Sequence, residues 1–258
     1  MAGRIGSLIG RWHIGRAAGY WAKQTQAAAR IDVAALHRLR GEARALRRQI
    51  DVVLQMADDR LALPGLTAGL PRMPLGTDWV WRPDLWRGPL ALPGKIAPSA
   101  RTPLSDDFAL YHDCPLGEVA LRQIRNQTEA DRAPFGLVLD VFGFQGSFLS
   151  LAFTLPEAGI AGLGARHLVE LQGILHSDAP LPAFARLNLQ HGPNVAQVVS
   201  ALPMVRAGLS FAEFDLAYAG LGPRPVTKAW LDLIFNDPGM NRVTLRDLVV
   251  SRRPRAEL

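Results

Sequence analysis

Polar side chains that alternate with apolar ones in the C-terminal two-thirds of the chain are the residues best suited to chemistry. They are carboxylates, amides and an arginine, with one tryptophan among them. Planar carboxylate, amide and guanidinium groups pair with adjacent sugar hydroxyls, while an indole ring covers the apolar face of a pyranose. The candidate ligand-binding residues of this kind are Asp140, Glu170, Gln172, Arg186, Asn188, Glu213, Asp215, Trp230 and Asp232. The alternative is a polar sheet face that is merely solvated.

A second candidate is the stretch TDWVWRPDLWRGP at residues 77–89, which contains Trp79, Trp81 and Trp86. Trp79 and Trp81 are two residues apart, so they project to the same side of an extended segment. The rings either clamp this segment onto the domain that follows or form a platform on which a sugar ring stacks. The clamp is the favoured interpretation, and the platform keeps all three among the ligand-binding candidates.

Glycoside cleavage requires two carboxyl groups on one site. Glu170 together with Glu213, Asp215 or Asp232 would supply such a pair, and this makes a glycan-active hydrolase or lyase the alternative to a binding module. The sequence does not fix the distance between these groups, so it predicts no particular catalytic residue.

Cysteine and histidine positions give no stronger catalytic signal. His112 and Cys114 would share one side of a strand, and a buried structural cysteine is favoured there over a nucleophile. His176, Asp178 and His191 match no known metal-ligand spacing. We therefore expect neither a metal nor a cofactor.

The elements that must position the polar residues are short strands. From about residue 106 the pattern has a period of two, and turns containing glycine, proline or asparagine interrupt it. Ten strands with no long helix between them predict a mainly β, antiparallel, jelly-roll-like β-sandwich over residues 106–258. The expected strands are 107–112, 117–125, 136–143, 147–155, 167–176, 183–190, 194–202, 211–218, 228–235 and 242–251. One face is apolar and the other carries all the polar candidates.

Residues 63–105 differ from the flanking segments in composition. Their prolines fix the backbone and donate no hydrogen bond, so regular structure is excluded over most of this stretch. We expect an irregular strap rich in proline, glycine and tryptophan that packs on the sandwich. The prolines stand at positions 64, 71, 74, 83, 89, 93, 98 and 103.

Residues 1–62 are expected to form a basic amphipathic helical arm. Its clearest helix covers 28–62, where apolar residues recur every three or four positions, as in a short coiled coil. A helix lying on its own domain is favoured over one that pairs with a partner or a second copy. In the preceding segment, an unordered tail is favoured over a helix in a membrane interface. The candidate assembly or membrane residues are Trp12, Leu39, Leu46, Ile50 and Val53.

Charge separates the arm from the rest. The net charge is +6, and residues 1–60 carry all of this excess, with eleven Lys and Arg against five Asp and Glu. An anionic partner, such as a membrane surface, therefore suits the arm, and nucleic-acid binding by the β-domain is not expected. The single cysteine excludes an internal disulfide, and no apolar run is long enough to span a membrane. The expected location is the cytoplasm, with the inner membrane as a peripheral site.

Three motifs carry a resemblance: DWVWRPDLWRGP, then LYHDCPLGEVALRQIRN, then the strand series that ends RVTLRDLVVS. Together they resemble an uncharacterised alphaproteobacterial family, a domain of unknown function, over nearly the whole chain. The closing WLDLIFNDPGMNRVTLRDLVVSRRP is similar to the last hairpin of carbohydrate-binding jelly-roll modules. The first resemblance brings no activity with it.

The sequence thus predicts a non-catalytic binding module that recognises a glycan or a protein partner. The basic helix would dock it to a membrane surface or mediate assembly into a homo-oligomer. The alternatives are the glycan-active enzyme described above and a structural subunit that self-associates through the helix.

Overall fold

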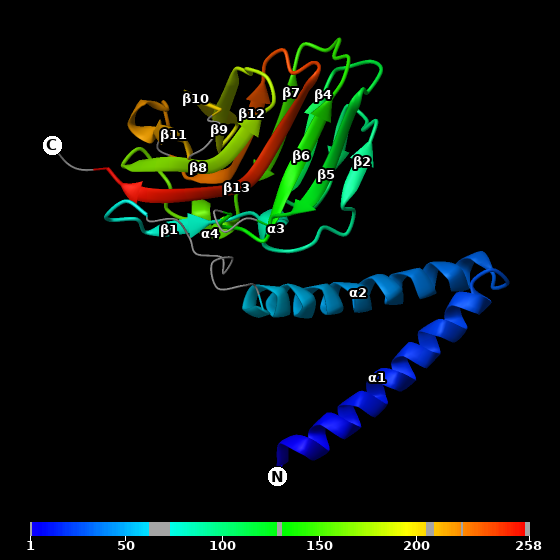
Figure 1. Ribbon diagram of the computed structural model, residues 1–258. Helices are drawn as coiled ribbons and strands as arrows, with labels where there is room; N and C mark the ends of the chain where they lie inside the picture. The colour runs from blue at the N-terminus through cyan, green and yellow to red at the C-terminus, as the bar shows by residue number, and fades with distance from the viewer. Residues whose placement is uncertain (1, 62–72, 128–130, 205–208, 223, 256–258) are drawn as a thin grey trace. The chain divides into compact units, whose positions relative to one another are not determined.

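The computed structural model of the protein describes residues 2–61, 73–127, 131–204, 209–222 and 224–255 (Figure 1). The chain divides into two units, Met1–Val53 and Leu54–Leu258. The first is helical, and the second contains the β-structure.

The helical part consists of α1 (Ala2–Ala27) and α2 (Val33–Leu61). The expected helix at 28–62 is present from residue 33, where the Asp32 carboxylate accepts a hydrogen bond from the backbone N–H of Ala35 at 2.8 Å. The favoured unordered tail before it is wrong, because α1 is a helix. None of the helices in the described part of the chain has the length and apolar character needed to cross a membrane.

The apolar seam of α2 is largely uncovered. Leu36, Leu46, Ile50 and Val53 are all exposed, and Leu39 is half-buried. The described side chains of this helix therefore leave an apolar stripe available for contact.

The second unit is a β-sandwich of two antiparallel sheets, and the mainly β, jelly-roll-like fold predicted from the sequence is confirmed. Figure 1 shows β8, β13, β6, β5 and β2 as one layer in front of β12, β7 and β4. The seven-stranded sheet has the order β11 (Ser210–Asp215), β8 (His167–Ser177), β13 (Asn241–Pro254), β6 (Phe135–Val141), β5 (Val119–Arg125) and β2 (Gly94–Ile96), with β1 (Trp79–Trp81) paired to β13. The six-stranded sheet has the order β10 (Asn194–Ala201), β9 (Ala183–His191), β12 (Val226–Phe235), β7 (Leu149–Thr154), β4 (Phe108–His112) and β3 (Arg101–Pro103).

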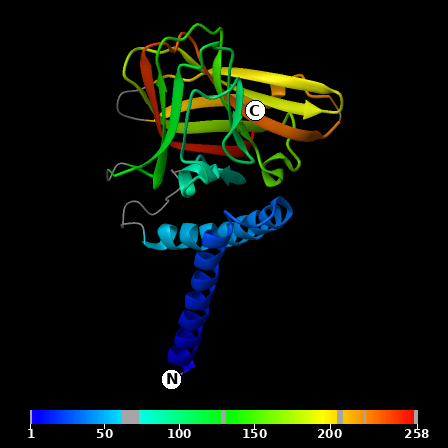
Figure 2. The same ribbon diagram turned by 90° about the vertical axis from the view of Figure 1, so that its right-hand side faces the viewer.

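Each of the ten strands expected beyond residue 106 is found. The main difference is at 216–218, where the 3-10 helix η1 (Leu216–Tyr218) replaces the end of a strand. The hairpin of β9 and β10, yellow in Figure 2, turns over two residues, Gly192 and Pro193, between the paired His191 and Asn194. Gly192 has φ 60°, a value that glycine adopts without strain.

Alternate side chains of both sheets meet between the layers and form one apolar core. The rings of Phe108 and Phe153 stack with centroids 4.7 Å apart, and Trp86 lies 5.5 Å from Phe153. Trp86 is completely buried, and its indole N–H donates to the backbone oxygen of Leu245 at 3.3 Å. Because Phe153 and Leu245 belong to different sheets, Trp86 contacts both layers.

The strap is bonded to the sandwich at several points. It supplies β1, β2, β3 and the four-residue helix α3 (Asp84–Arg87). Arg82 forms a buried ion pair with Asp247 of β13, with nitrogen–oxygen distances of 2.9 and 3.0 Å. The Gln123 side chain on β5 makes three further hydrogen bonds with strap backbone at 2.7–2.8 Å. The first tryptophans, Trp79 and Trp81, also pack against the core.

Candidate functional site

The polar candidates do not lie on one surface, so the predicted common polar face is wrong. They divide between the outward sides of the two sheets, because β6, β8 and β11 belong to the seven-stranded sheet whereas β9 and β12 belong to the six-stranded one. Face A, the outward side of the seven-stranded sheet, carries Asp140, Glu170, Gln172, Glu213 and Asp215. Face B, the outward side of the six-stranded sheet, carries Arg186, Asn188, Trp230 and Asp232.

On face A the acids are joined to arginines. Arg253 bonds both Glu170, at 3.1 Å, and Glu213, at 2.7 Å, while Gln172 donates to the other oxygen of Glu170 at 2.7 Å. Both carboxylate oxygens of Glu170 are therefore engaged. Asp140 similarly pairs with Arg242 at 2.5 Å and Arg122 at 3.6 Å, and Asp215 pairs with Arg255 at 3.4 Å.

This arrangement corrects one of the carboxylate pairs expected for glycan cleavage. Glu170 and Asp232 lie on different sheets and cannot form one site. Glu170 and Glu213 are direct cross-strand partners, but Arg253 bonds both of them. One internal cation thus bonds both carboxylates and offsets part of their charge.

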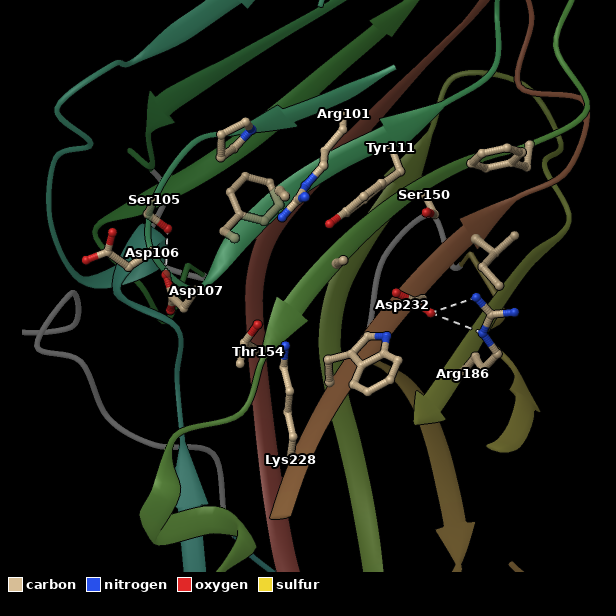
Figure 3. A pocket seen from close by; sticks show the side chains of 17 residues that line it. Arg101, Ser105, Asp106, Asp107, Tyr111, Ser150, Thr154, Arg186, Lys228 and Asp232 are labelled. Atoms are coloured by element: carbon tan, nitrogen blue, oxygen red, sulfur yellow. Dashed lines mark hydrogen bonds and ion pairs between the residues drawn. The ribbon is translucent and has the colours of Figure 1, made fainter. Parts of the chain in front are cut away.

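Face B contains a groove with a volume of about 830 Å³. Its floor comes from β12, β7 and β4, β9 contributes at one side, and β3 with the β3–β4 loop contributes at the other. Figure 3 shows the pair of Arg186 and Asp232 across the groove from Asp106 and Asp107. The lining residues are Arg101, Pro103, Ser105, Asp106, Asp107, Phe108, Ala109, Tyr111, Phe148, Ser150, Ala152, Thr154, Arg186, Lys228, Trp230, Asp232 and Ile234.

Asp232 is at the centre of a fixed hydrogen-bond network. Its Oδ2 accepts from Arg186 at 2.8 and 3.0 Å and from the amide of Asn188 at 2.9 Å. Gln197 on β10 holds that amide in turn, donating to its Oδ1 at 3.0 Å. None of these bonds uses Oδ1 of Asp232, a residue that lines the groove. Asn188 is fully buried, which corrects its assignment as a ligand contact: it positions Asp232 instead.

Two aromatic rings of the groove each have a cation over them. The guanidinium of Arg101 lies 5.8 Å from the Tyr111 ring centroid, and the Lys228 ammonium lies 5.8 Å from that of Trp230. Trp230 and Tyr111 are half-buried, so part of each ring can be reached from solvent. Such rings beside ordered polar groups are suited to contact a ligand with both apolar and hydroxyl-rich surfaces.

Asp107 has a perturbed acidity. Burial raises the pKa of its carboxyl group, and the nearby charges of Asp84 and Asp106 act in the same direction, against a hydrogen bond from Ser105 that lowers it. The net result is a raised pKa.

Several groove residues were not among the sequence candidates, in particular Arg101, Tyr111, Ser150, Thr154 and Lys228. Strand alternation does place Ser150 and Thr154 on the polar side of their strand. Arg101 belongs to the strap, over most of which regular structure was excluded, so its part in the groove depends on the β3–β4 pairing.

The three tryptophans of the strap all pack in or against the core of the sandwich. Trp79 and Trp81 stack on one another with centroids 6.4 Å apart and pack against the core, and Trp79 lies close to Gly159 of the short helix α4 (Glu157–Ile160). Complete burial of Trp86 corrects its place among ligand-binding candidates. These contacts describe a clamp between the strap and the sandwich.

His112 and Cys114 are both buried, and the imidazole of His112 accepts the backbone N–H of Cys114 at 3.1 Å. Burial raises the pKa of the Cys114 thiol, but hydrogen bonds from four backbone groups outweigh it, so the pKa is lowered. His176 lies on the seven-stranded sheet and His191 on the six-stranded one. Across the described ranges, no three His, Cys, Asp or Glu side chains gather as a metal site would require.

Fold and groove together define a β-sandwich protein with a recessed outer sheet face. The chain belongs to a family of unknown function, DUF6478, whose model matches residues 1–258, and the resemblance read from the three motifs is confirmed. No curated protein matches the chain.

Solved structures match part of the chain at low similarity. A family 11 carbohydrate-binding module from Clostridium thermocellum, in complex with a β-1,3-1,4-mixed-linked tetrasaccharide, is 6% identical with a TM-score of 0.38, over 60% of this chain and 92% of that one. The CBM22-1 xylan-binding domain of Paenibacillus barcinonensis Xyn10C is 13% identical with a TM-score of 0.38, over 65% and 99%. The enzymatically active domain of bacteriophage CBA120 tailspike protein 4 is 11% identical with a TM-score of 0.40, over 56% of this chain and 19% of that one.

Proposed function

We propose that the protein is a non-catalytic binding module whose β-sandwich recognises a glycan in the groove of face B. The observation that carries this proposal is the combination of Trp230 and Tyr111 with the ordered pair of Arg186 and Asp232 in one hollow. A sugar presents an apolar ring face beside planar hydroxyl pairs, which such a combination complements.

The form of the groove also favours a glycan over a folded protein partner. A volume of about 830 Å³ lies within the usual range for small-ligand sites, roughly 300–1,000 Å³. The groove offers open acceptors and donors as well: Oδ1 of Asp232 and the hydroxyls of Ser150 and Thr154 take part in none of the hydrogen bonds seen among the described residues.

The test is a glycan array with the full chain, followed by titration calorimetry on the glycans that bind. Trp230→Ala is expected to weaken binding about 30-fold, because removal of a central aromatic contact costs about 2 kcal/mol. Phe211→Ala is the matched control, since Phe211 is an exposed aromatic residue on face A. Absence of binding to every glycan, or an equal loss in both variants, would overturn the proposal.

The same glycans also test the enzyme alternative. Incubation of the protein with each bound glycan, followed by chromatography, should leave the glycan intact. Cleavage that disappears in Asp232→Asn would replace the binding module with a glycan-active enzyme.

For the arm, we propose assembly through the exposed seam of α2 and docking of its basic residues on an anionic surface. Leu46 and Ile50 lie on this seam and are exposed. Sedimentation should show an oligomer for the wild type and a smaller species for Leu46→Asp; an unchanged monomer would overturn assembly.

Flotation of the chain with anionic and neutral liposomes tests membrane docking separately. The proposal places the protein in the cytoplasm, which cell fractionation tests.

A further inference from the structure

Within the described part of the chain, two cations in the groove of face B form no ion pair with an acid. Arg101 and Lys228 lie beyond ion-pair distance of every carboxylate in the described ranges, whereas the third cation, Arg186, is neutralised by Asp232. Each of the two unpaired cations lies over an aromatic ring instead. Figure 3 shows that both point into the same part of the groove, Arg101 from β3 and Lys228 from β12.

The cost of binding depends on what replaces water around these two cations. A neutral ligand seated on Trp230 and Tyr111 would remove water from both charged groups without supplying a counter-charge, which is unfavourable. An anionic substituent would satisfy them, since a guanidinium bonds a carboxylate or sulfate through two parallel donors and an ammonium adds a point charge.

None of the acids that line the groove lies within ion-pair distance of Arg101 or Lys228. Asp107 is bonded to Ser105, and neither Asp106 nor Asp107 forms an ion pair with Arg101 or Lys228. Figure 3 shows both aspartates at the side of the groove, with the two cations directed toward its middle.

We propose that the ligand of this groove is an anionic glycan, whose carboxylate or sulfate group is held between Arg101 and Lys228. This inference rests on the proposed glycan-binding function and names the class of glycan.

The experiment compares charged and uncharged probes on the full chain by titration calorimetry at low and high salt. The carboxylated probes are oligosaccharides of alginate, polygalacturonate and hyaluronate, and each is paired with its carboxyl-reduced counterpart. Heparin and chondroitin sulfate oligosaccharides supply the sulfate group, while xylan and β-glucan oligosaccharides are neutral. Binding is expected for a charged class, with a loss of about tenfold or more on carboxyl reduction or desulfation and a marked weakening by salt.

The double variant Arg101→Gln with Lys228→Gln should lose the preference for the charged probe while it keeps the wild-type melting temperature. Lys95→Gln is the control, because Lys95 is an exposed cation on β2 of the other sheet. Equal binding of charged and neutral probes would overturn the anionic ligand and leave the glycan-binding function standing. Equal losses in the double variant and the control would also overturn it, and binding to no probe at all would overturn both proposals.

Discussion

Face A and face B contain the same kinds of side chain but arrange them differently. On face A, Arg253 joins two glutamates, and Asp140 lies between two arginines. On face B one arginine is neutralised, and two cations lie over aromatic rings in a hollow. Residue composition is therefore a poor guide to a binding surface, because pairing decides which polar groups remain available to a ligand.

The largest expected loss of stability concerns the ion pair of Arg82 with Asp247 on β13, which is buried, whereas the ion pairs of face A are partly exposed. The side chains of Arg82 and Asp247 are 3% and 4% exposed. Arg82→Met should lower the free energy of unfolding by about 3–5 kcal/mol, because it leaves an uncompensated buried carboxylate. Arg122→Met, which removes a half-exposed partner of Asp140, should cost less than about 1 kcal/mol. Urea unfolding measures both, and equal losses would mean that burial does not distinguish these pairs.

The next largest effect concerns glycan affinity and compares two tyrosines, each with an arginine over its ring. Arg101 lies over the ring of Tyr111 on face B, and Arg255 lies 5.5 Å from the ring of Tyr218, next to face A. Tyr111→Ala should weaken glycan binding about tenfold, since an aromatic contact contributes about 0.5–1.5 kcal/mol beyond the area that it buries. Tyr218→Ala should leave the dissociation constant unchanged. Calorimetry on a glycan that binds the wild type measures both dissociation constants. A loss of affinity confined to Tyr218→Ala would contradict a binding site on face B and indicate one near face A.

The smallest effect is a pH dependence of stability at Asp107. Its pKa is raised above the ordinary 3.8, so its contribution to stability is present below pH 3.8 and is lost as the pH rises through the folded-state pKa. Asp107→Asn should therefore be more stable than wild type at neutral pH, by less than about 1 kcal/mol, and the difference should shrink on acidification.

Asp113 provides the opposite case for comparison. Hydrogen bonds from Ser147 and Phe148 lower the pKa of its carboxyl group below 3.8. The carboxylate therefore contributes stability above pH 3.8, and this contribution is lost as the pH falls through the lowered pKa. Asp113→Asn should therefore be less stable than wild type at neutral pH. Thermal melts of both variants across the acid range measure the two trends, and a common sign would contradict the assigned causes.

Much of the fold was predictable because alternation is a local property. A strand such as 149–154 places Leu149, Leu151 and Phe153 inward whichever neighbour it pairs with. The same rule correctly separated Asp232 and Trp230 from their apolar neighbours Leu231 and Leu233.

The candidate site was less predictable, because no local pattern states which sheet a strand joins. Glu170 and Arg186 belong to β8 and β9, which are successive in the chain, yet β8 pairs with β13 and β9 with β12. Arg101 reaches the groove through a pairing of β3 with β4 in a segment whose prolines predicted irregular structure. Burial of Trp86 likewise depends on contact with both layers.

The sequence by itself determined the class of the fold, the ten main strands and the separation of a basic arm. Periodicity, turn residues and charge are local properties that can be read from neighbouring residues alone. Only the tertiary structure decided which acids form ion pairs and where a hollow forms whose two cations have no ion pair with any described carboxylate. Ion pairs such as that of Arg253 with Glu170 join residues 83 positions apart, and side chains so distant in sequence are brought together by strand pairing and layer packing alone.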